Sequence, residues 1–219
     1  MKRYNHELSA IDILDLVGEA PIMLEIGCHE GADTIRFLEY MPGIRLFCFD
    51  PEQRATKRFK QAVLPDERVT LYEEAVADVD GPRDFHASTG KAGRRDDWDF
   101  SGSLREPTGH LARSPEITFK EPVSVPCMRL DTWFADHPEI DNIDFIWADI
   151  QGSQRLFIAG AQHILSKTRY LYIESHDPPL YAGEPTQDEL IDELYSMFSP
   201  VAIYRENILF ESMTAASVC

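Results

Sequence analysis

Apolar and polar residues alternate along this chain in short blocks that predict strands and helices by turns. The apolar runs with the length of buried strands lie at 22–26, 44–49, 69–72, 143–148 and 170–174. The segments with the amphipathic spacing of helices lie at 8–17, 34–40, 53–63, 130–136, 154–165 and 186–197. Strands that alternate with helices of about ten residues favour a parallel sheet with right-handed crossovers. We therefore expect an α/β, Rossmann-like fold with a mostly parallel sheet.

Two regions depart from this rhythm. Residues 78–128 contain Gly81-Pro82, a long polar run and strand-like pieces only at 84–87 and 123–128. A connection of this length is usually functional, so we expect it to form a substrate wall or a lid. The end of the chain, 201–204 and 208–210 around Glu206-Asn207, predicts a C-terminal antiparallel hairpin strand. With a leading helix within residues 1–20, the whole of 1–219 is expected to be one domain.

Charge and cysteine usage narrow the class of protein. Lys and Arg number 21 against 38 Asp and Glu, and the formal charge of −17 disfavours nucleic acid and anionic membrane as partners. The basic residues Lys91, Arg94 and Arg95 are followed by Asp96, Asp97 and Asp99, which predicts a solvated loop. No apolar run approaches the roughly 20 residues of a membrane span, and the first residues do not resemble a signal peptide. The cysteines are far apart and form no C-x-x-C pair: they are Cys28, Cys48, Cys127 and Cys219. We expect a reducing cytoplasm, with neither a disulfide framework nor structural zinc.

The first strand runs into a glycine loop that opens a helix, in the sequence Met23-Leu24-Glu25-Ile26-Gly27-Cys28-His29-Glu30-Gly31. Nucleotide-like ligands bind at this edge of open α/β sheets. The spacing is G-x-x-x-G, and Glu25 precedes the first glycine by two residues. A carboxylate beside a pyrophosphate would repel it, whereas it would attract the sulfonium and ammonium groups of S-adenosylmethionine. These features favour S-adenosylmethionine over a dinucleotide.

Two further acidic segments agree with this interpretation. Asp50 ends the second strand, where a carboxylate can accept hydrogen bonds from both ribose hydroxyls, although it also simply begins an Asp-Pro turn with Pro51. After the third strand, Ala75 and Val76 lie in Glu74-Ala75-Val76-Ala77-Asp78 and could flank an adenine ring or form a surface turn.

These motifs resemble those of FkbM-type methyltransferases over residues 20–212. The segments that carry the resemblance, in order, are 25–31, 49–51, 74–78, Ser101-Gly102-Ser103-Leu104, Arg129-Leu130-Asp131, Asp149-Ile150-Gln151-Gly152 and Ile173-Glu174-Ser175-His176. The resemblance implies a class I methyltransferase fold, which has the terminal hairpin, with S-adenosylmethionine as donor and a hydroxyl on a sugar or natural product as acceptor. It also implies which residues bind the donor. Together with their neighbours in sequence, these candidate donor-binding residues are Glu25, Gly27, Cys28, His29, Gly31, Asp50, Pro51, Ala75, Val76, Ser103 and Asp149.

The chain departs from the family pattern at identifiable positions. The family commonly has an acidic pair where this chain has Gln151 and Gln154, and alanine and asparagine where it has Cys28 and His29. The glutamines weaken any carboxylate-based metal or acid–base role at their own positions. We assign no metal ligand and leave the need for a divalent metal open.

Methyl transfer to oxygen requires alignment of the partners and removal of the hydroxyl proton. The candidate catalytic residues, His176, Asp149 and Glu174, lie at the carboxyl ends of two predicted strands. We expect His176 to be the base because an unperturbed imidazole is largely neutral at cellular pH, although it could simply open the loop before Pro178. Asp149 could orient the acceptor or cap a helix, and Glu174 could pair with a cationic acceptor or help to hold a divalent ion.

Two other functions compete with an O-methyltransferase. A nicotinamide-dependent oxidoreductase would share the fold, but Glu25 and the glycine spacing count against it. A non-catalytic binding module of the same fold is compatible with Gln151 and Gln154. In either case we expect a small-molecule partner, and the sequence leaves the oligomeric state open.

Overall fold

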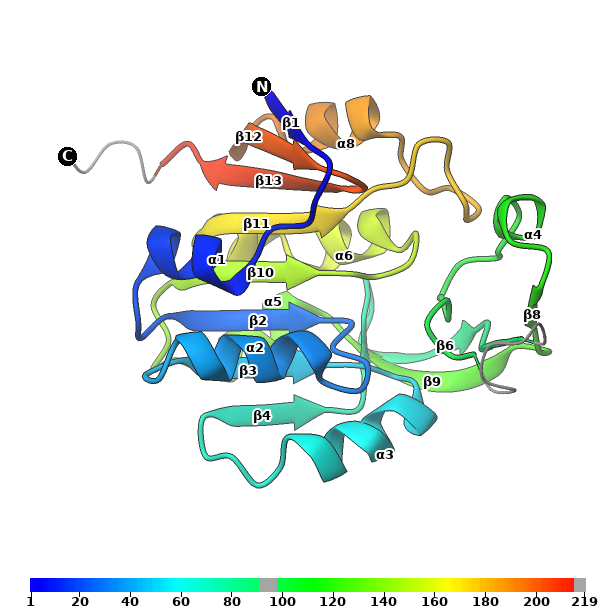
Figure 1. The fold of residues 1–219 in the computed structure, drawn as a ribbon, viewed down its shortest axis with the longest axis horizontal. Helices are drawn as coiled ribbons and strands as arrows, with labels where there is room; N and C mark the ends of the chain where they lie inside the picture. The colour runs from blue at the N-terminus through cyan, green and yellow to red at the C-terminus, as the bar shows by residue number, and fades with distance from the viewer. Residues whose placement is uncertain (91–97, 215–219) are drawn as a thin grey trace.

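The computed structural model describes residues 1–90 and 98–214, so the predictions for 91–97 and for Cys219 lie outside the described residues. An eight-stranded sheet has the order β1-β12-β13-β11-β10-β2-β3-β4 (Figure 1). Its strands are β1 (Lys2–Tyr4), β2 (Ile22–Ile26), β3 (Arg45–Phe49), β4 (Val69–Tyr72), β10 (Ile143–Ala148), β11 (Thr168–Glu174), β12 (Phe198–Tyr204) and β13 (Asn207–Ser212). The predicted α/β fold is confirmed.

The strands pair in parallel except at β13, which is antiparallel to both β11 and β12. This is the hairpin that the end of the sequence predicts, although its turn lies one residue earlier than expected. Tyr204 pairs with Asn207, so the turn residues are Arg205 and Glu206. Strand β1 pairs in parallel with β12 at the edge of the sheet and was not predicted, because three residues are too few to show a pattern.

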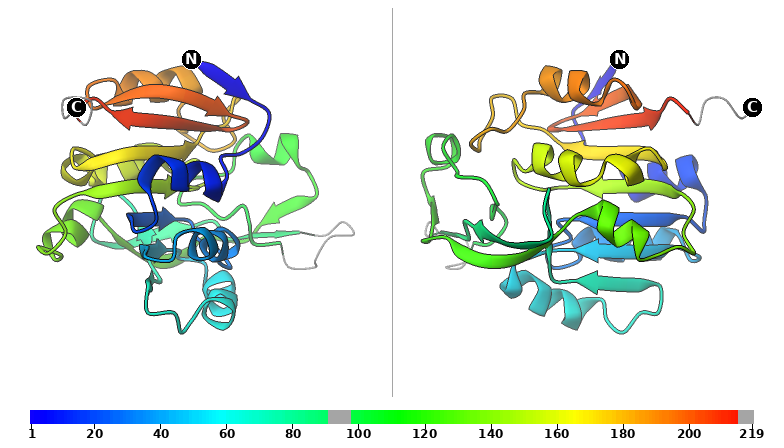
Figure 2. Two further views of the ribbon diagram at one scale, coloured as in Figure 1. Left: turned by 60° about the vertical axis from the view of Figure 1, so that its left-hand side comes forward. Right: turned by 180° about the vertical axis from the view of Figure 1, so that it is seen from behind.

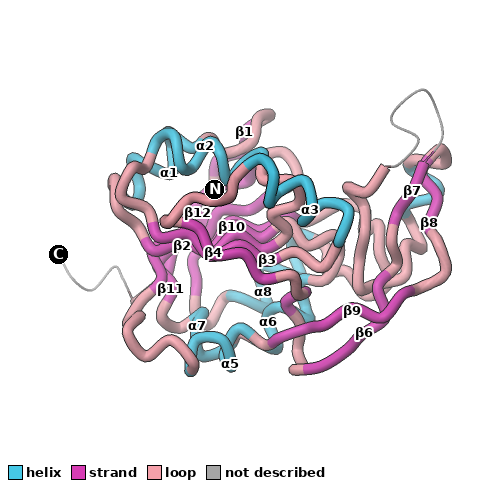
Figure 3. The backbone as a smooth tube through the Cα atoms, turned by 90° about the horizontal axis from the view of Figure 1, so that it is seen from below, coloured by secondary structure: helices cyan, strands magenta, loops and turns pink. Residues whose placement is uncertain are grey.

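Helices cover both faces of the sheet (Figure 3). One layer holds α1 (Ala10–Val17), α2 (Ala32–Tyr40) and α3 (Gln53–Ala62), and the other holds α5 (Leu130–Ala135), α6 (Gln154–Gly160), α7 (Gln162–Leu165) and α8 (Gln187–Leu194). Successive residues of a strand point to opposite faces, so Met23 packs in the core beside the first layer and Leu24 in the core beside the second.

The predicted helix over 154–165 is divided into α6 and α7. Gly160 ends α6 where the backbone just after β5 comes very close, since a Cβ atom at Gly160 would lie 1.9 Å from the Ala77 carbonyl oxygen. The prediction of one continuous helix was therefore wrong. Helix α8 ends at Leu194, three residues before the predicted end at Met197.

The segment 78–128 lies beside the carboxyl ends of the central strands and is less irregular than its sequence suggests (Figures 1 and 2). Its strands β6 (Gly81–Phe85) and β9 (Val123–Met128) form a small sheet with β5 (Ala75–Val76). A second pair, β7 (Ser88–Gly90) and β8 (Ile117–Phe119), extends it, and the short helix α4 (His110–Arg113) lies between them in sequence. Among the described residues, no helix is long and apolar enough to cross a membrane.

Candidate functional site

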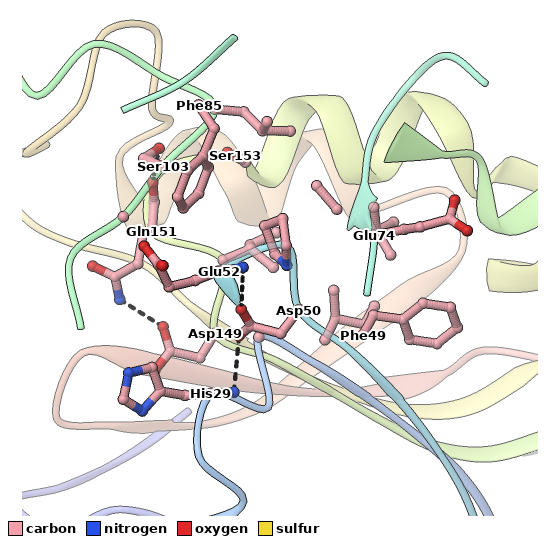
Figure 4. A pocket seen from close by; sticks show the side chains of 18 of the residues that line it. His29, Phe49, Asp50, Glu52, Glu74, Phe85, Ser103, Asp149, Gln151 and Ser153 are labelled. Carbon is pink, nitrogen blue, oxygen red and sulfur yellow. Dashed lines mark hydrogen bonds between the residues drawn. The ribbon is translucent and has the colours of Figure 1, made fainter. Parts of the chain in front are cut away.

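A pocket of about 680 Å³, part of it open to solvent, lies at the carboxyl ends of β2, β3 and β10 (Figure 4). The sequence-predicted residues that line it are Gly27, His29, Asp50, Pro51, Ala75, Val76, Ser103 and Asp149. The pocket therefore gathers most of the predicted donor-binding residues from separate segments of the chain.

Gly27 is required by a close approach of two backbones. Its φ is +86°, and a Cβ atom there would lie 1.8 Å from the carbonyl oxygen of Asp149. The Asp149 N–H donates to the Ile26 carbonyl at 2.9 Å, which fixes the end of β10 against the glycine loop. The loop and Asp149 therefore form one wall of the pocket.

Asp50 is the buried carboxylate of the pocket. Its Oδ2 accepts from the His29 N–H and its Oδ1 accepts from the Glu52 N–H, both at 2.8 Å (Figure 4). Burial raises the pKa of Asp50 and the two backbone hydrogen bonds oppose this rise, which leaves the pKa at about 6. Asp50 is therefore mostly ionised at neutral pH, with each oxygen held in a fixed direction.

Three of the predicted donor-binding residues lie behind the loop and not in the pocket. Glu25 faces α2, where its Oε2 accepts from Thr34 Oγ1 at 2.5 Å, and burial raises its pKa to about 8. The Cys28 thiol is buried, with its pKa also raised by burial. Gly31, with φ +86°, lies against Phe59 and Val63, the residues that a Cβ atom there would meet. These residues pack the glycine loop against the neighbouring helices and do not face the pocket.

The segment 78–128, which we call the insertion, contributes residues to the opposite wall of the pocket. Ser103 donates from Oγ to the Gln151 carbonyl at 2.5 Å, which ties the insertion to the loop after β10. Phe85, Asp99, Phe100 and Leu104 also line the pocket from this side. Tyr181 is buried and does not line the pocket, and its hydroxyl donates to Gln151 Oε1 at 2.9 Å.

The carboxyl ends of β10 and β11 bring Asp149 and Glu174 together around one amide. Gln151 Nε2 donates to Asp149 Oδ1 at 2.6 Å and to Glu174 Oε1 at 3.0 Å. Asp149 is an exposed residue on the side that lines the pocket, and protein atoms desolvate its carboxyl group on the other sides. Burial and then the Glu174 carboxylate raise the pKa of Asp149 well above its usual range. A carboxylate at position 151 would add a third negative charge here, whereas the amide bridges the two that are present.

His176 lies between two carboxylates. Its Nδ1 is 2.7 Å from Glu184 Oε1 and its Nε2 is 3.3 Å from Glu174 Oε1. Burial favours the neutral ring, but the hydrogen bonds to Glu174 and Glu184 outweigh it and raise the pKa of His176 to about 10. The expectation of a neutral imidazole therefore does not hold in this arrangement, and the ring does not line the pocket.

A charged cluster beside the glycine loop was not predicted from the sequence. The buried Asp99 accepts from His29 Nε2 at 2.9 Å and from Arg58 Nη2 at 2.7 Å, and the Phe100 ring lies 4.0 Å from the His29 ring. Burial raises the pKa of Asp99, but the two partners outweigh this effect and lower the pKa to about 2. The three residues come from separate segments, so no sequence spacing could have indicated the cluster.

In the described part of the chain, no group of three or more His, Cys, Asp or Glu side chains is placed to hold a metal ion. Asp149 and Glu174 are joined to Gln151 and His176 instead.

Comparisons with known proteins show the family to which this chain belongs. A solved structure described as a fibrillarin/Nop5p complex matches with a TM-score of 0.50 at 11% identity, covering 93% of this chain and 80% of that chain, which supports the fold alone. The 2-O-methyltransferase NoeI of Sinorhizobium fredii (strain NBRC 101917 / NGR234) is 41% identical over 176 residues, which are 80% of this chain and 72% of that protein. The family model described as "Methyltransferase FkbM domain" matches residues 25–203. This chain therefore belongs to the FkbM family of methyltransferases.

Proposed function

We propose that this protein transfers the methyl group of S-adenosylmethionine to a hydroxyl oxygen of a small molecule, such as a sugar or another natural product. The observation that carries the proposal is Asp50, an anchored carboxylate in the pocket at the ends of β2 and β3. The similarity to a protein named as a 2-O-methyltransferase supports oxygen as the methyl acceptor.

The residues of the pocket fit the proposed donor. Each oxygen of Asp50 has a lone pair left after its backbone hydrogen bond, so the carboxylate can accept from two ribose hydroxyls. Ala75 and Val76 offer small apolar surfaces for the adenine ring. Ser153 lines the same pocket, and its buried Oγ has no hydrogen-bond partner in the structure. A buried hydroxyl without a partner is costly, and a bound ligand would satisfy it.

The donor supplies an already activated methyl group, so the protein has to align the acceptor and remove its proton. Asp149 is the base that we propose, because it opens into the pocket and its raised pKa makes it a better proton acceptor than an ordinary aspartate. Gln151 holds Asp149 Oδ1 in position. His176 and Glu174 support this group from behind, with the imidazolium balancing the charge of Glu174.

Binding and product analysis test the proposal. Calorimetry with S-adenosylhomocysteine and with NAD separates a methyltransferase from a nicotinamide-dependent oxidoreductase, and we expect binding only of the former. Incubation with S-adenosylmethionine and a panel of sugars and phenols, read by mass spectrometry, should then show a gain of one methyl group. Tight NAD binding, or donor binding with no methylation across broad acceptor panels, would favour the oxidoreductase or the binding module.

A further inference from the structure

Arg105 is a half-buried cation next to the pocket, and its guanidinium group has no partner among the described residues. It directly follows Ser103 and Leu104, which line the pocket, and its backbone N–H donates to Ser103 Oγ at 2.9 Å. Its Nε is buried and makes no hydrogen bond. No hydrogen bond or ion pair involves the rest of its guanidinium group within the residues that the structure describes.

This situation sets Arg105 apart from the other arginines of the described chain, all of which have a hydrogen-bond or ion-pair partner. These are Arg3, Arg36, Arg45, Arg54, Arg58, Arg68, Arg83, Arg113, Arg129, Arg155, Arg169 and Arg205. In a protein with a formal charge of −17, carboxylates are abundant, so the lack of one beside Arg105 is unusual.

Two more arginines, Arg83 and Arg155, lie near the Arg105 side chain. Arg155 donates to the Gly183 carbonyl at 3.0 Å, and Arg105 Nη1 lies 4.0 Å from the position of a Cβ atom at Gly183. Arg155 is itself ion-paired with Glu189 and Glu193, at 3.2 Å and 2.7 Å. Arg83 is close enough to act electrostatically on Arg105, and its own Nε is also buried without a partner. Asp78, which also acts electrostatically on Arg105, is already bound to Arg83.

We propose that Arg105, flanked by Arg83 and Arg155, binds an oxyanion group such as phosphate, sulfate or carboxylate next to the pocket. A buried donor without an acceptor carries a free-energy cost, and among the described residues Arg105 has no paired carboxylate, whereas Arg83 and Arg155 do. An oxyanion removes this cost, because it accepts hydrogen bonds from the planar guanidinium group of Arg105 and supplies the negative charge that Arg105 lacks. If the anion is carried by the methyl acceptor, the site selects an acidic substrate, and this part of the inference rests on the proposed function.

Calorimetry at constant ionic strength tests the site, with inorganic phosphate, galactose 6-phosphate and galactose as probes. We expect both phosphates to bind the protein and galactose alone not to bind. Arg105→Gln should weaken phosphate binding about tenfold or more, because a charge-assisted pair is lost, and Arg105→Lys should weaken it less. Arg36→Gln, which changes an exposed arginine paired with Asp33 on α2, is the matched control and should bind phosphate normally.

Thermal unfolding adds a readout that a structural role for Arg105 would not give. Arg105→Gln should leave the midpoint unchanged or raise it without phosphate, and phosphate should stabilise only the unmodified protein. Tighter binding of galactose 6-phosphate than of phosphate would assign the anion to the acceptor, and equal binding would assign it to a free ion. Equal phosphate affinity in the unmodified protein and Arg105→Gln, or no phosphate binding at all, would overturn the proposal. If S-adenosylhomocysteine still binds in that case, the proposed function stands without the anion site.

Discussion

His176 and Glu184 form a buried ion pair, with Nδ1 of the histidine 2.7 Å from Oε1 of the glutamate. The Glu184 Oε2 also accepts from the N–H groups of Leu180 and Tyr181, at 2.7 Å and 3.1 Å. This pair holds the loop after β11 in place, next to the carboxylate that we propose as the base. It therefore links the stability of the fold to the charge of one imidazole.

The first prediction concerns pH and stability. The pKa of His176 in the folded state is about 10, above the value of about 6.5 expected in the unfolded chain. Its contribution to the free energy of unfolding is therefore fully present below about pH 6.5 and is lost as the pH rises through 10. Urea unfolding between pH 6.5 and 10 should show this loss, and His176→Gln should remove most of it. The exposed His6→Gln is the control, and a His176→Gln protein with the unmodified pH dependence would contradict the assignment.

The second prediction concerns donor binding. Asp50→Asn keeps the shape of the side chain but removes the charge that accepts from the ribose hydroxyls. We expect the affinity for S-adenosylhomocysteine to fall about ten- to a hundredfold, since a hydrogen bond to a charged group contributes about 1.5–3 kcal/mol. Calorimetry measures this, with the surface change Asp33→Asn as the control. Unchanged affinity in a folded Asp50→Asn protein would remove Asp50 from the donor site.

The third prediction separates chemistry from binding. Asp149→Asn should lower the turnover number by about 10²–10⁴, the usual contribution of a positioned base, with a much smaller effect on S-adenosylhomocysteine affinity. The rate of the unmodified enzyme should rise with pH until Asp149 is ionised, and the variant should lose this dependence. If His176→Gln abolishes turnover while Asp149→Asn retains it, the base is the histidine and its charge state must change when ligands bind.

The fourth prediction concerns the glycine loop. Gly27→Ala should destabilise the protein strongly, because its Cβ atom would lie 1.8 Å from the backbone oxygen of Asp149. Gly18→Ala is the matched control, since Gly18 has a similar φ of +81° but nothing within 4 Å of its Cβ position. The control should cost only the strain of a positive φ, about 1–3 kcal/mol. Thermal unfolding of both variants isolates the clash, and equal losses would show that the close approach relaxes easily.

The sequence predicts the pocket well where a local pattern sets the position of a residue. Gly27, Asp50 and Asp149 each follow an apolar strand, and parallel strands bring their carboxyl ends to one edge. Glu25 is different, because a strand alternates its side chains and residue 25 points to the helix layer on the face of Met23. The charge of His176 depends on Glu184, which a loop brings back eight positions later, and the isolation of Arg105 depends on three segments. Neither property leaves a signal in the spacing of the residues.

The contact between Gly27 and Asp149 has a consequence for how this enzyme can diverge. The donor loop and the proposed base share one backbone junction, so neither can be repositioned alone without breaking the fit at 27. The insertion meets that junction through side chains such as Ser103, and most of its residues that line the pocket lie in the loop 99–104, outside its small sheets. We therefore expect substitutions that change the methyl acceptor to occur in residues 78–128, while the arrangement of the donor loop and the proposed base is kept.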